Sequence, residues 1–371
     1  MTSDSLPSPF VGRPLEELPT PSLIVDRRVL ARNVDRMAHA IGDLGVELRP
    51  HWKATKVVEI GRLQLDAGAV GLTAATAEEV TALLDGGVTS IFWAYPAVGP
   101  HRIARAVSAN VAAEVIVGGD SVENFVELAL AASAAGVTVP VRLAVDTGLG
   151  RLGVHPDDAI AAIRVVAGLS GLEFRGIYTH EGQVQGQGPD AAKRAAAAHA
   201  AGTLMVQVAE ATRAEGIPVR DVSVGSTPGG ALTASIPGIT EARPGTYVYG
   251  DENQAHIGTL PPENCAAEVL ARVIGIRRGE TTLIDAGIKA MSSDGSLHGD
   301  GRIGTVTSTV GAIVYTGHEE HGFVRGLVDP SVGDLVRVRP NHACGVSNMH
   351  SRVFVIDDGV VSDVWPIVGR H

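Results

Sequence analysis

Short apolar runs alternate with longer amphipathic stretches through the first two thirds of the chain. Arg27–Leu44 is one of the amphipathic stretches, and its apolar residues at helical spacing predict a helix. Strands that alternate with helices predict a parallel sheet, and eight such strands close a (β/α)8 barrel of the TIM type. The eight predicted barrel strands are Val46–Arg49, Val70–Ala74, Ile91–Tyr95, Glu114–Val117, Val139–Asp146, Phe174–His180, Asp221–Ser226 and Thr246–Tyr249.

The pattern changes after Pro261, where short β-rich runs follow one another with Gly, Asp and Pro between them. Such a pattern predicts a C-terminal all-β domain. Ser22–Asp26 is a ninth strand, and we expect it to join that second domain. The predicted division is an N-terminal arm and strand at residues 1–26, a barrel at 27–258 and a β-domain at 259–371.

Composition narrows the function classes. The 371 residues are 45% hydrophobic but only 4% aromatic, which suits an aliphatic core of buried parallel strands. A net charge of −11 without a long basic run argues against nucleic acid or an anionic membrane as partner. The start of the chain lacks the features of a signal peptide, and two cysteines cannot build a disulfide framework. We therefore expect a cytoplasmic protein.

The segment Arg49–Lys56 places two lysines, a histidine and an arginine at the end of the first predicted barrel strand. Catalytic residues of such barrels lie at the carboxyl ends of the strands. The hypothesis is that Lys53 holds pyridoxal phosphate (PLP) as a Schiff base, with His51 beside the cofactor. A solvated basic turn is the alternative interpretation.

Other strand ends carry the remaining parts of a PLP site. The loops after strands seven and eight commonly bind phosphate, because free backbone N–H groups and hydroxyls lie there. A flexible turn is the alternative for the glycine-rich loop after strand seven. Arg151, in the glycine-rich turn after strand five, is a candidate for the phenolic oxygen of the cofactor. The candidates for the phosphate are Ser226, Thr227, Gly245 and Thr246.

The predicted β-domain contains a possible metal pair, His342 and Cys344. On a strand, residues two apart face the same way, so the two side chains can share one ion. Imidazole with thiolate favours zinc, and two protein ligands leave positions open for water or substrate. A core cysteine beside a surface histidine is the alternative. The nearby His318 and His321 are three apart, which does not match the metalloprotease spacing.

Taken together, these segments resemble the D-serine dehydratase / D-threonine aldolase family, fold-type III PLP enzymes with an alanine racemase-like barrel. The matching segments occur in family order along nearly the whole chain. They are Leu18–Asp26, Arg49-Pro50-His51-x-Lys53-x-x-Lys56, Asp146-x-Gly148-x-x-Arg151-x-Gly153, Gly225–Pro228, Glu241-x-Arg243–Tyr247, Asp285-Ala286-Gly287-x-Lys289-Ala290, Glu320–Gly322 and Pro340–His342-x-Cys344.

The resemblance implies a role for each candidate around the cofactor. Lys53 would be the Schiff-base lysine, with Lys56 near but not bonded to the cofactor. Arg151 would contact the phenolic oxygen, and Tyr178 or Arg243 would lie near the pyridine ring. The resemblance also implies a homodimer in which the β-domain of the partner completes each active site.

The same resemblance also implies which residues hold the cofactor phosphate and the divalent ion. It implies that the phosphate is held after strands seven and eight, and that a divalent ion near the substrate is held in the β-domain. Zinc is favoured, with manganese or magnesium as alternatives. The implied phosphate ligands are Ser226, Thr227, Gly245 and Thr246, and the implied metal ligands are His342 and Cys344.

Two departures from the family pattern lie close to the expected substrate position. Trp52 is a bulky residue directly before the lysine, and Ala54-Thr55 replaces a common Thr-His. Gln183 stands where relatives often have histidine. Both departures affect the expected specificity.

The expected reaction is that of a lyase acting on a small D-3-hydroxy amino acid. The resemblance associates a His-x-Cys pair with zinc-dependent D-serine dehydratases and His-x-Asp with aldolases, so Cys344 favours α,β-elimination to a keto acid and ammonia. D-threonine aldolase-type cleavage to glycine and an aldehyde is the alternative. An amino-acid racemase, a non-catalytic PLP carrier and a structural-zinc protein without cofactor are further alternatives.

Overall fold

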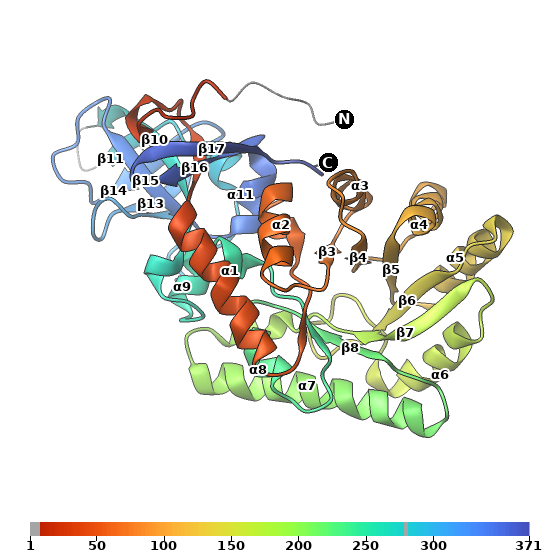
Figure 1. The fold of residues 1–371 in the computed structure, drawn as a ribbon. Helices are drawn as coiled ribbons and strands as arrows, with labels where there is room; N and C mark the ends of the chain where they lie inside the picture. The colour runs from red at the N-terminus through yellow and green to blue at the C-terminus, as the bar shows by residue number, and fades with distance from the viewer. Residues whose placement is uncertain (1–7, 278–280, 371) are drawn as a thin grey trace. The chain divides into compact units, whose positions relative to one another are not determined.

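The computed structural model describes residues 8–277 and 281–370. The chain forms two compact units, each made of several segments (Figure 1). One unit comprises residues 35–53, 60–245 and 369–371, and the other comprises 1–34, 54–59 and 246–368. The domain boundaries given above stay a prediction, and each unit is treated below by itself.

The first unit contains an eight-stranded parallel sheet with the strand order β2-β9-β8-β7-β6-β5-β4-β3. Backbone hydrogen bonds from Val70 N to Leu48 O (2.9 Å) and from Thr73 N to Pro50 O (2.8 Å) link the two ends of this order. The predicted (β/α)8 barrel is therefore confirmed. Its strands are β2 (Glu47–Leu48), β3 (Leu72–Ala74), β4 (Ser90–Trp93), β5 (Glu114–Gly119), β6 (Val139–Ala144), β7 (Leu172–Tyr178), β8 (Asp221–Val224) and β9 (Glu241–Ala242).

The helices that follow these strands begin at residues suited to cap them. The hydroxyl of Thr76 accepts from Glu79 N, and that of Ser121 accepts from Asn124 N. Such caps satisfy backbone N–H groups that have no partner within the helix. The helices are α2 (Val58–Asp66), α3 (Ala77–Asp85), α4 (Pro100–Ala112), α5 (Val122–Ala135), α6 (Pro156–Ala167), α7 (Ala191–Ala214) and α8 (Gly230–Ala234), after α1 (Arg27–Gly42).

The prediction of an eighth strand at Thr246–Tyr249 is wrong. The eighth strand is the two-residue β9, which pairs with β2 and β8. Pro244 follows within two residues and has no N–H to continue the ladder. Thr246–Val248 instead forms a 3-10 turn, and its β-branched and aromatic side chains are buried outside the sheet. The tertiary packing of these residues thus overrides their intrinsic preference for strands.

The second unit contains a nine-stranded, mostly antiparallel sheet with the order β11-β14-β13-β12-β15-β10-β1-β16-β17. Strand β1 (Ser22–Asp26) lies in this sheet, antiparallel to β10 and parallel to β16. The later strands are β10 (Ala267–Arg277), β11 (Thr281–Ile284), β12 (Gly304–Val306), β13 (Ile313–Gly317), β14 (Gly322–Arg325), β15 (Leu335–Pro340), β16 (Arg352–Asp357) and β17 (Val360–Pro366), with short helices α9 (Glu252–His256), α10 (Ile288–Met291) and α11 (Ala343–Met349).

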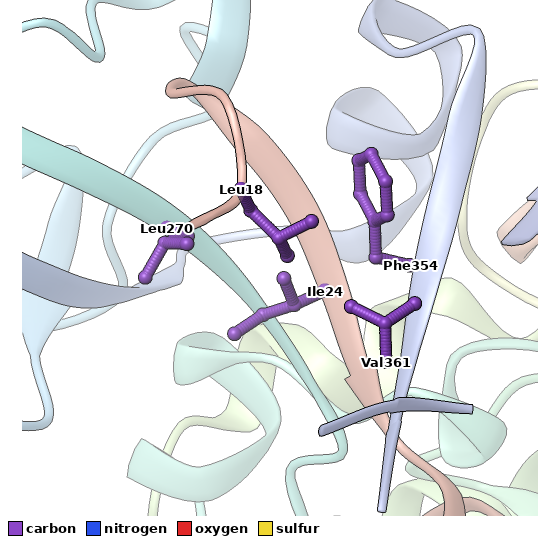
Figure 2. Packing of buried hydrophobic residues seen from close by; sticks show 5 residues of the cluster. All are labelled: Leu18, Ile24, Leu270, Phe354 and Val361. Atoms are coloured by element: carbon purple, nitrogen blue, oxygen red, sulfur yellow. The ribbon is translucent and has the colours of Figure 1, made fainter. Parts of the chain in front are cut away.

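Strand β1 shares an apolar cluster with strands that are distant in sequence (Figure 2). Leu18 and Ile24 pack with Leu270, Phe354 and Val361, and all five side chains are almost completely buried. Burying such side chains contributes roughly 1.5–3 kcal/mol each before entropic costs. This packing explains why an N-terminal strand belongs to the sheet built mainly by the C-terminal third.

No helix in the described parts of the chain is long and apolar enough to cross a membrane.

Candidate functional site in the barrel unit

Lys53 lies in a single 3-10 turn, Trp52–Ala54, directly after strand β2. Two backbone hydrogen bonds hold the preceding segment beside the end of β9, from Arg49 N to Ala242 O (3.0 Å) and from His51 N to Pro244 O (2.9 Å). The lysine is therefore presented from the carboxyl end of a barrel strand, as the sequence predicts. Trp52 is only 1% exposed, so the bulky residue before the lysine packs in the interior.

The side chain of Lys53 lines a cavity of about 520 Å³, a volume that includes its open mouth. The other lining residues come mainly from the ends of strands or from the loops after them. They are His51, Ala94, Ala144, Leu149, Arg151, Leu152, Tyr178, Thr179, His180, Gly225 and Arg243. The structure thus brings five predicted site residues together: Lys53, His51, Arg151, Tyr178 and Arg243.

Tyr178 presents a hydroxyl group with no hydrogen-bond partner among the described residues, although the atom is buried. Its ring packs edge-on against Phe92, with the ring centroids 5.0 Å apart. Burial raises the pKa of this phenol above its ordinary value. A buried hydroxyl without a partner costs free energy, so a polar ligand atom in the cavity would satisfy it.

Arg243 lies beside the Tyr178 ring, with its guanidinium carbon 5.5 Å from the ring centroid. It donates to Thr179 O (2.6 Å) and to the hydroxyl of Ser223. Burial lowers its pKa to about 10, and the neighbouring Arg142 also lowers it, while Glu241 opposes both. The group remains a fixed cation at neutral pH.

A buried ion network inside the barrel supports this cation. The Glu241 carboxylate accepts from Arg49 Nε (2.7 Å) and from both terminal nitrogens of Arg142. It also accepts a hydrogen bond from the Ser223 hydroxyl, and that hydroxyl oxygen in turn accepts one from Arg243. Burial alone would raise the pKa of Glu241, but Arg142 and Arg49 lower it well below its ordinary value. The carboxylate is therefore ionised, and through Ser223 it fixes the position of Arg243.

Two histidines flank Lys53 in the cavity. Burial, and then the charge of Lys53, lower the pKa of His51 well below its ordinary value. The same causes lower the pKa of His180 to about 3. Both imidazoles are therefore neutral at neutral pH. His180 was missed as a site residue, yet the sequence held the signal, because it lies two residues beyond Tyr178 and so on the same side of an extended chain.

The predicted phosphate loop after β8 is fixed by a carboxylate. Glu181 is fully buried and accepts from Gly225 N (2.9 Å) and Ser226 Oγ (3.1 Å). The Ser226 oxygen in turn accepts from Gly229 N (2.8 Å). The loop reaches the cavity through Gly225, and Ser226 and Thr227 follow it directly. Glu181 was not predicted from the sequence.

The other predicted phosphate ligands lie at the point in the sequence where a segment of one unit is followed by a segment of the other. Gly245 ends a segment of the barrel unit, and Thr246 begins a segment of the other. Their backbones are adjacent in the chain, so the pair follows β9 closely. The two residues therefore follow the eighth strand, whereas the sequence pattern places them at the start of the predicted strand Thr246–Tyr249.

Arg151 extends from a tight turn after β6. The Asp146 carboxylate accepts from three successive backbone groups, those of Gly148, Leu149 and Gly150, at 2.9 to 3.1 Å. Although partial burial raises the pKa of Asp146, these N–H groups lower it below its ordinary value. The turn is thereby held in one shape, and its exposed Arg151 lines the cavity.

The predicted metal pair belongs to the second unit. The expectation that His342 and Cys344 share a strand face is wrong, because β15 ends at Pro340 and α11 begins at Ala343. The two side chains nevertheless interact at the start of this helix. Cys344, and also Asp251, raise the pKa of His342 well above its ordinary value. No group of three or more potential metal-ligating side chains occurs within the described residues.

Comparison with known proteins agrees with this architecture. The sequence model of the alanine racemase N-terminal domain matches residues 25–253. That of a putative serine dehydratase domain matches residues 266–356. D-threo-3-hydroxyaspartate dehydratase of Delftia sp. (strain HT23) is 33% identical, covering 88% of this chain and 91% of the relative. The chain belongs to the D-serine dehydratase / D-threonine aldolase family, whose barrel is of the alanine racemase type.

Further relatives with the same fold include D-threonine aldolases as well as a dehydratase. D-threonine aldolase of Arthrobacter sp. is 30% identical, with 99% of this chain and 97% of the relative covered. The crystal structure of D-threonine aldolase from Filomicrobium marinum superposes with a TM-score of 0.92 at 28% identity, covering 97% of each chain. A cysteine-to-alanine variant of D-threo-3-hydroxyaspartate dehydratase, solved in the metal-free form, gives a TM-score of 0.89 at 30% identity, covering 95% of this chain and 98% of that one.

The cavity suits the cofactor of this PLP-dependent family. A lysine amine, an unpartnered buried hydroxyl and a fixed guanidinium line one small cavity. The loop after β8, whose Gly225 N–H donates to Glu181, lines the same cavity through Gly225. These are the groups that a lysine-bound aromatic phosphate ligand requires.

Proposed function

We propose that the protein is a PLP- and divalent-metal-dependent lyase of D-3-hydroxy amino acids, most similar in reaction to the D-serine dehydratases. The observation that carries the proposal is the position of Lys53, in one cavity with Tyr178, Arg151 and Arg243. The similarity to a dehydratase and the His342–Cys344 pair support elimination over carbon–carbon cleavage.

The residues of this chain would divide the chemistry as follows. PLP, when bound, supplies an electron sink for charge that develops at the substrate α-carbon. Lys53 would anchor the cofactor and, once replaced there by the substrate amine, would take the α-proton. His51 and His180, both neutral, add no positive charge beside it.

Arg243 would hold the ring nitrogen of the cofactor. A guanidinium only donates hydrogen bonds, so it would keep that nitrogen as an acceptor. Arg151 would face the phenolic oxygen, and Ser226, Thr227, Gly245 and Thr246 would hold the phosphate. His342 and Cys344 would hold a divalent ion, which polarises the hydroxyl oxygen that leaves.

The products of the proposed reaction balance without a further co-reactant. Loss of the α-proton and cleavage of the Cβ–O bond release water, and hydrolysis of the resulting imine gives a keto acid and ammonia. In the aldolase alternative, the hydroxyl loses its proton and the Cα–Cβ bond breaks, giving glycine and an aldehyde. The similarity to two D-threonine aldolases is the reason to retain this reaction as a second candidate function.

The cofactor assignment is tested by reconstituting the purified protein with PLP. The protein should turn yellow, and borohydride should bleach the colour and leave a reduced label on the peptide that contains Lys53. A colourless protein, or a label on another lysine, overturns the assignment.

The reaction is tested on D-serine, D-threonine and D-threo-3-hydroxyaspartate, with and without a chelator. Keto acid and ammonia that disappear with the chelator support the proposed dehydratase. Glycine with an aldehyde and no keto acid would establish the aldolase instead. The predicted homodimer is a separate question for light scattering.

A further inference from the structure

Asp251 is a buried acid next to the proposed metal pair, and its side chain is fully enclosed. One carboxylate oxygen accepts from Gln254 N (2.8 Å) and caps helix α9. The other accepts from Ala343 N (3.1 Å) and is 3.0 Å from Nδ1 of His342. A single carboxylate therefore joins the starts of two short helices to one imidazole.

The bond to His342 determines which ring nitrogen is available. An ionised carboxylate only accepts hydrogen bonds, so Nδ1 of His342 must carry the proton and donate it. A metal that binds this imidazole must therefore use the lone pair of Nε2. Ala343 N donates to the same oxygen, so the backbone after His342 is held together with the ring.

We propose that Asp251 is a positioning residue for the divalent ion: it holds the proton on Nδ1 of His342 and so presents Nε2, beside Cys344, as the metal ligand. The inference rests on the metal site of the proposed function. Carboxylates that accept from a ligating histidine fix its tautomer and orientation, and their loss costs about 10–100-fold in metal affinity.

A purely structural role makes a different prediction. If Asp251 only caps α9 and α11, an asparagine oxygen still accepts from Gln254 N or Ala343 N, and the ion binds as before. If it sets the tautomer, the asparagine amide instead donates toward Nδ1. The imidazole proton then moves to Nε2, which can no longer bind a metal without losing it.

The experiment measures zinc affinity of PLP-reconstituted wild type and Asp251→Asn by competition with a chelating dye. We expect zinc to bind the variant about 10–100-fold more weakly, with an unchanged circular dichroism spectrum. Asp285→Asn is the matched control. Asp285 also accepts from a backbone N–H, that of Arg272 (2.7 Å), and from a hydroxyl, that of Thr20 (2.5 Å). The Asp285→Asn variant should bind zinc as tightly as the wild type does.

A second measurement reads the tautomer directly and needs no Asp251 variant. In the zinc-loaded, nitrogen-15-labelled wild type, one imidazole N–H signal absent from His342→Ala should belong to Nδ1. Asp251→Asn, where it folds, should lose this protected signal. A signal from Nε2 in the wild type would overturn the inference whether or not the variant folds.

The outcomes separate the inference from the proposed function. Wild type that binds no zinc removes the metal part of the proposed function and the inference with it. Wild type that binds zinc, with Asp251→Asn equally tight, overturns the inference alone. Weaker binding by Asp251→Asn together with loss of its Nδ1 signal supports both.

Discussion

The barrel cavity and the His342–Cys344 pair assemble their side chains in opposite ways. The cavity collects residues from the ends of several parallel strands, from His51 to Arg243. The proposed metal pair comes from residues two apart at the start of one short helix. A barrel concentrates distant residues because all its strands end on one side. A local pair instead depends on a neighbour that fixes its orientation, which here is Asp251.

The two regions also differ in how they carry charge. The cavity rests on an ion network in which Glu241 accepts from Arg49 and Arg142. Beside the proposed metal pair there is one buried carboxylate, that of Asp251, which accepts from three donors. We therefore expect substitutions in the barrel to reduce stability and cofactor binding, and substitutions at the pair to reduce only the binding of the ion.

The largest expected effect is that of Lys53→Ala, which should lower turnover by about 1,000-fold or more, because both the anchor and the proposed base are lost. Initial rates and the borohydride label measure it. Lys56→Arg is the control, since the family resemblance places Lys56 off the cofactor. Retention of the covalent label in Lys53→Ala would contradict the assignment.

Cys344→Ala comes next and tests whether the two regions are separable. Loss of one of two protein ligands should reduce zinc content and lower metal-dependent turnover by about 100-fold, while the yellow colour stays. Metal analysis and absorbance are measured on the same sample. Cys265, the other cysteine, is half-buried, and burial raises its pKa to about 12, so Cys265→Ala should keep its zinc.

Glu241→Gln should destabilise the protein by about 3–5 kcal/mol, because it leaves buried arginines without their carboxylate. Urea unfolding measures this loss. Glu215→Gln, which breaks the exposed pair with Arg164, should cost less than about 1 kcal/mol. Equal losses in the two variants would show that the buried network has no special role.

The same network predicts a pH dependence with a definite sign. The pKa of Glu241 is lower in the folded protein than its ordinary value of 4.5. Its contribution to stability is therefore complete above that value and is lost as the pH falls toward the folded pKa. Acid should destabilise the wild type more steeply than Glu241→Gln.

The smallest expected effect is that of Tyr178→Phe. The cofactor-free variant should change in stability by less than about 1 kcal/mol, because the removed hydroxyl has no partner among the described residues. PLP should bind about fivefold more weakly if the hydroxyl bonds to it. Tyr249→Phe is the control, since Tyr249 also has a buried, unpartnered hydroxyl but lies in the other unit. Equal PLP affinities in wild type and both variants would remove Tyr178 from the cofactor site.

Much of the cavity could be predicted because its residues follow from periodic structure. Alternating strands and helices predict the barrel, and the barrel places Lys53, Tyr178 and Arg243 at one side. His180 was within reach of the same argument. Glu181 was not, because its role depends on contacts with Gly225 and Ser226, 44 and 45 residues away in the chain.

The sequence by itself determined the order of elements, the family and the candidates that line the cavity, because hydrophobic periodicity and motif spacing are local properties. Only the tertiary structure decided that β9 ends before Pro244, that His342 and Cys344 begin a helix, and that Asp251 and Glu241 orient other side chains. These features depend on which distant groups satisfy a buried polar atom. A pattern along the chain does not contain that information, since any of several distant partners could satisfy the same atom.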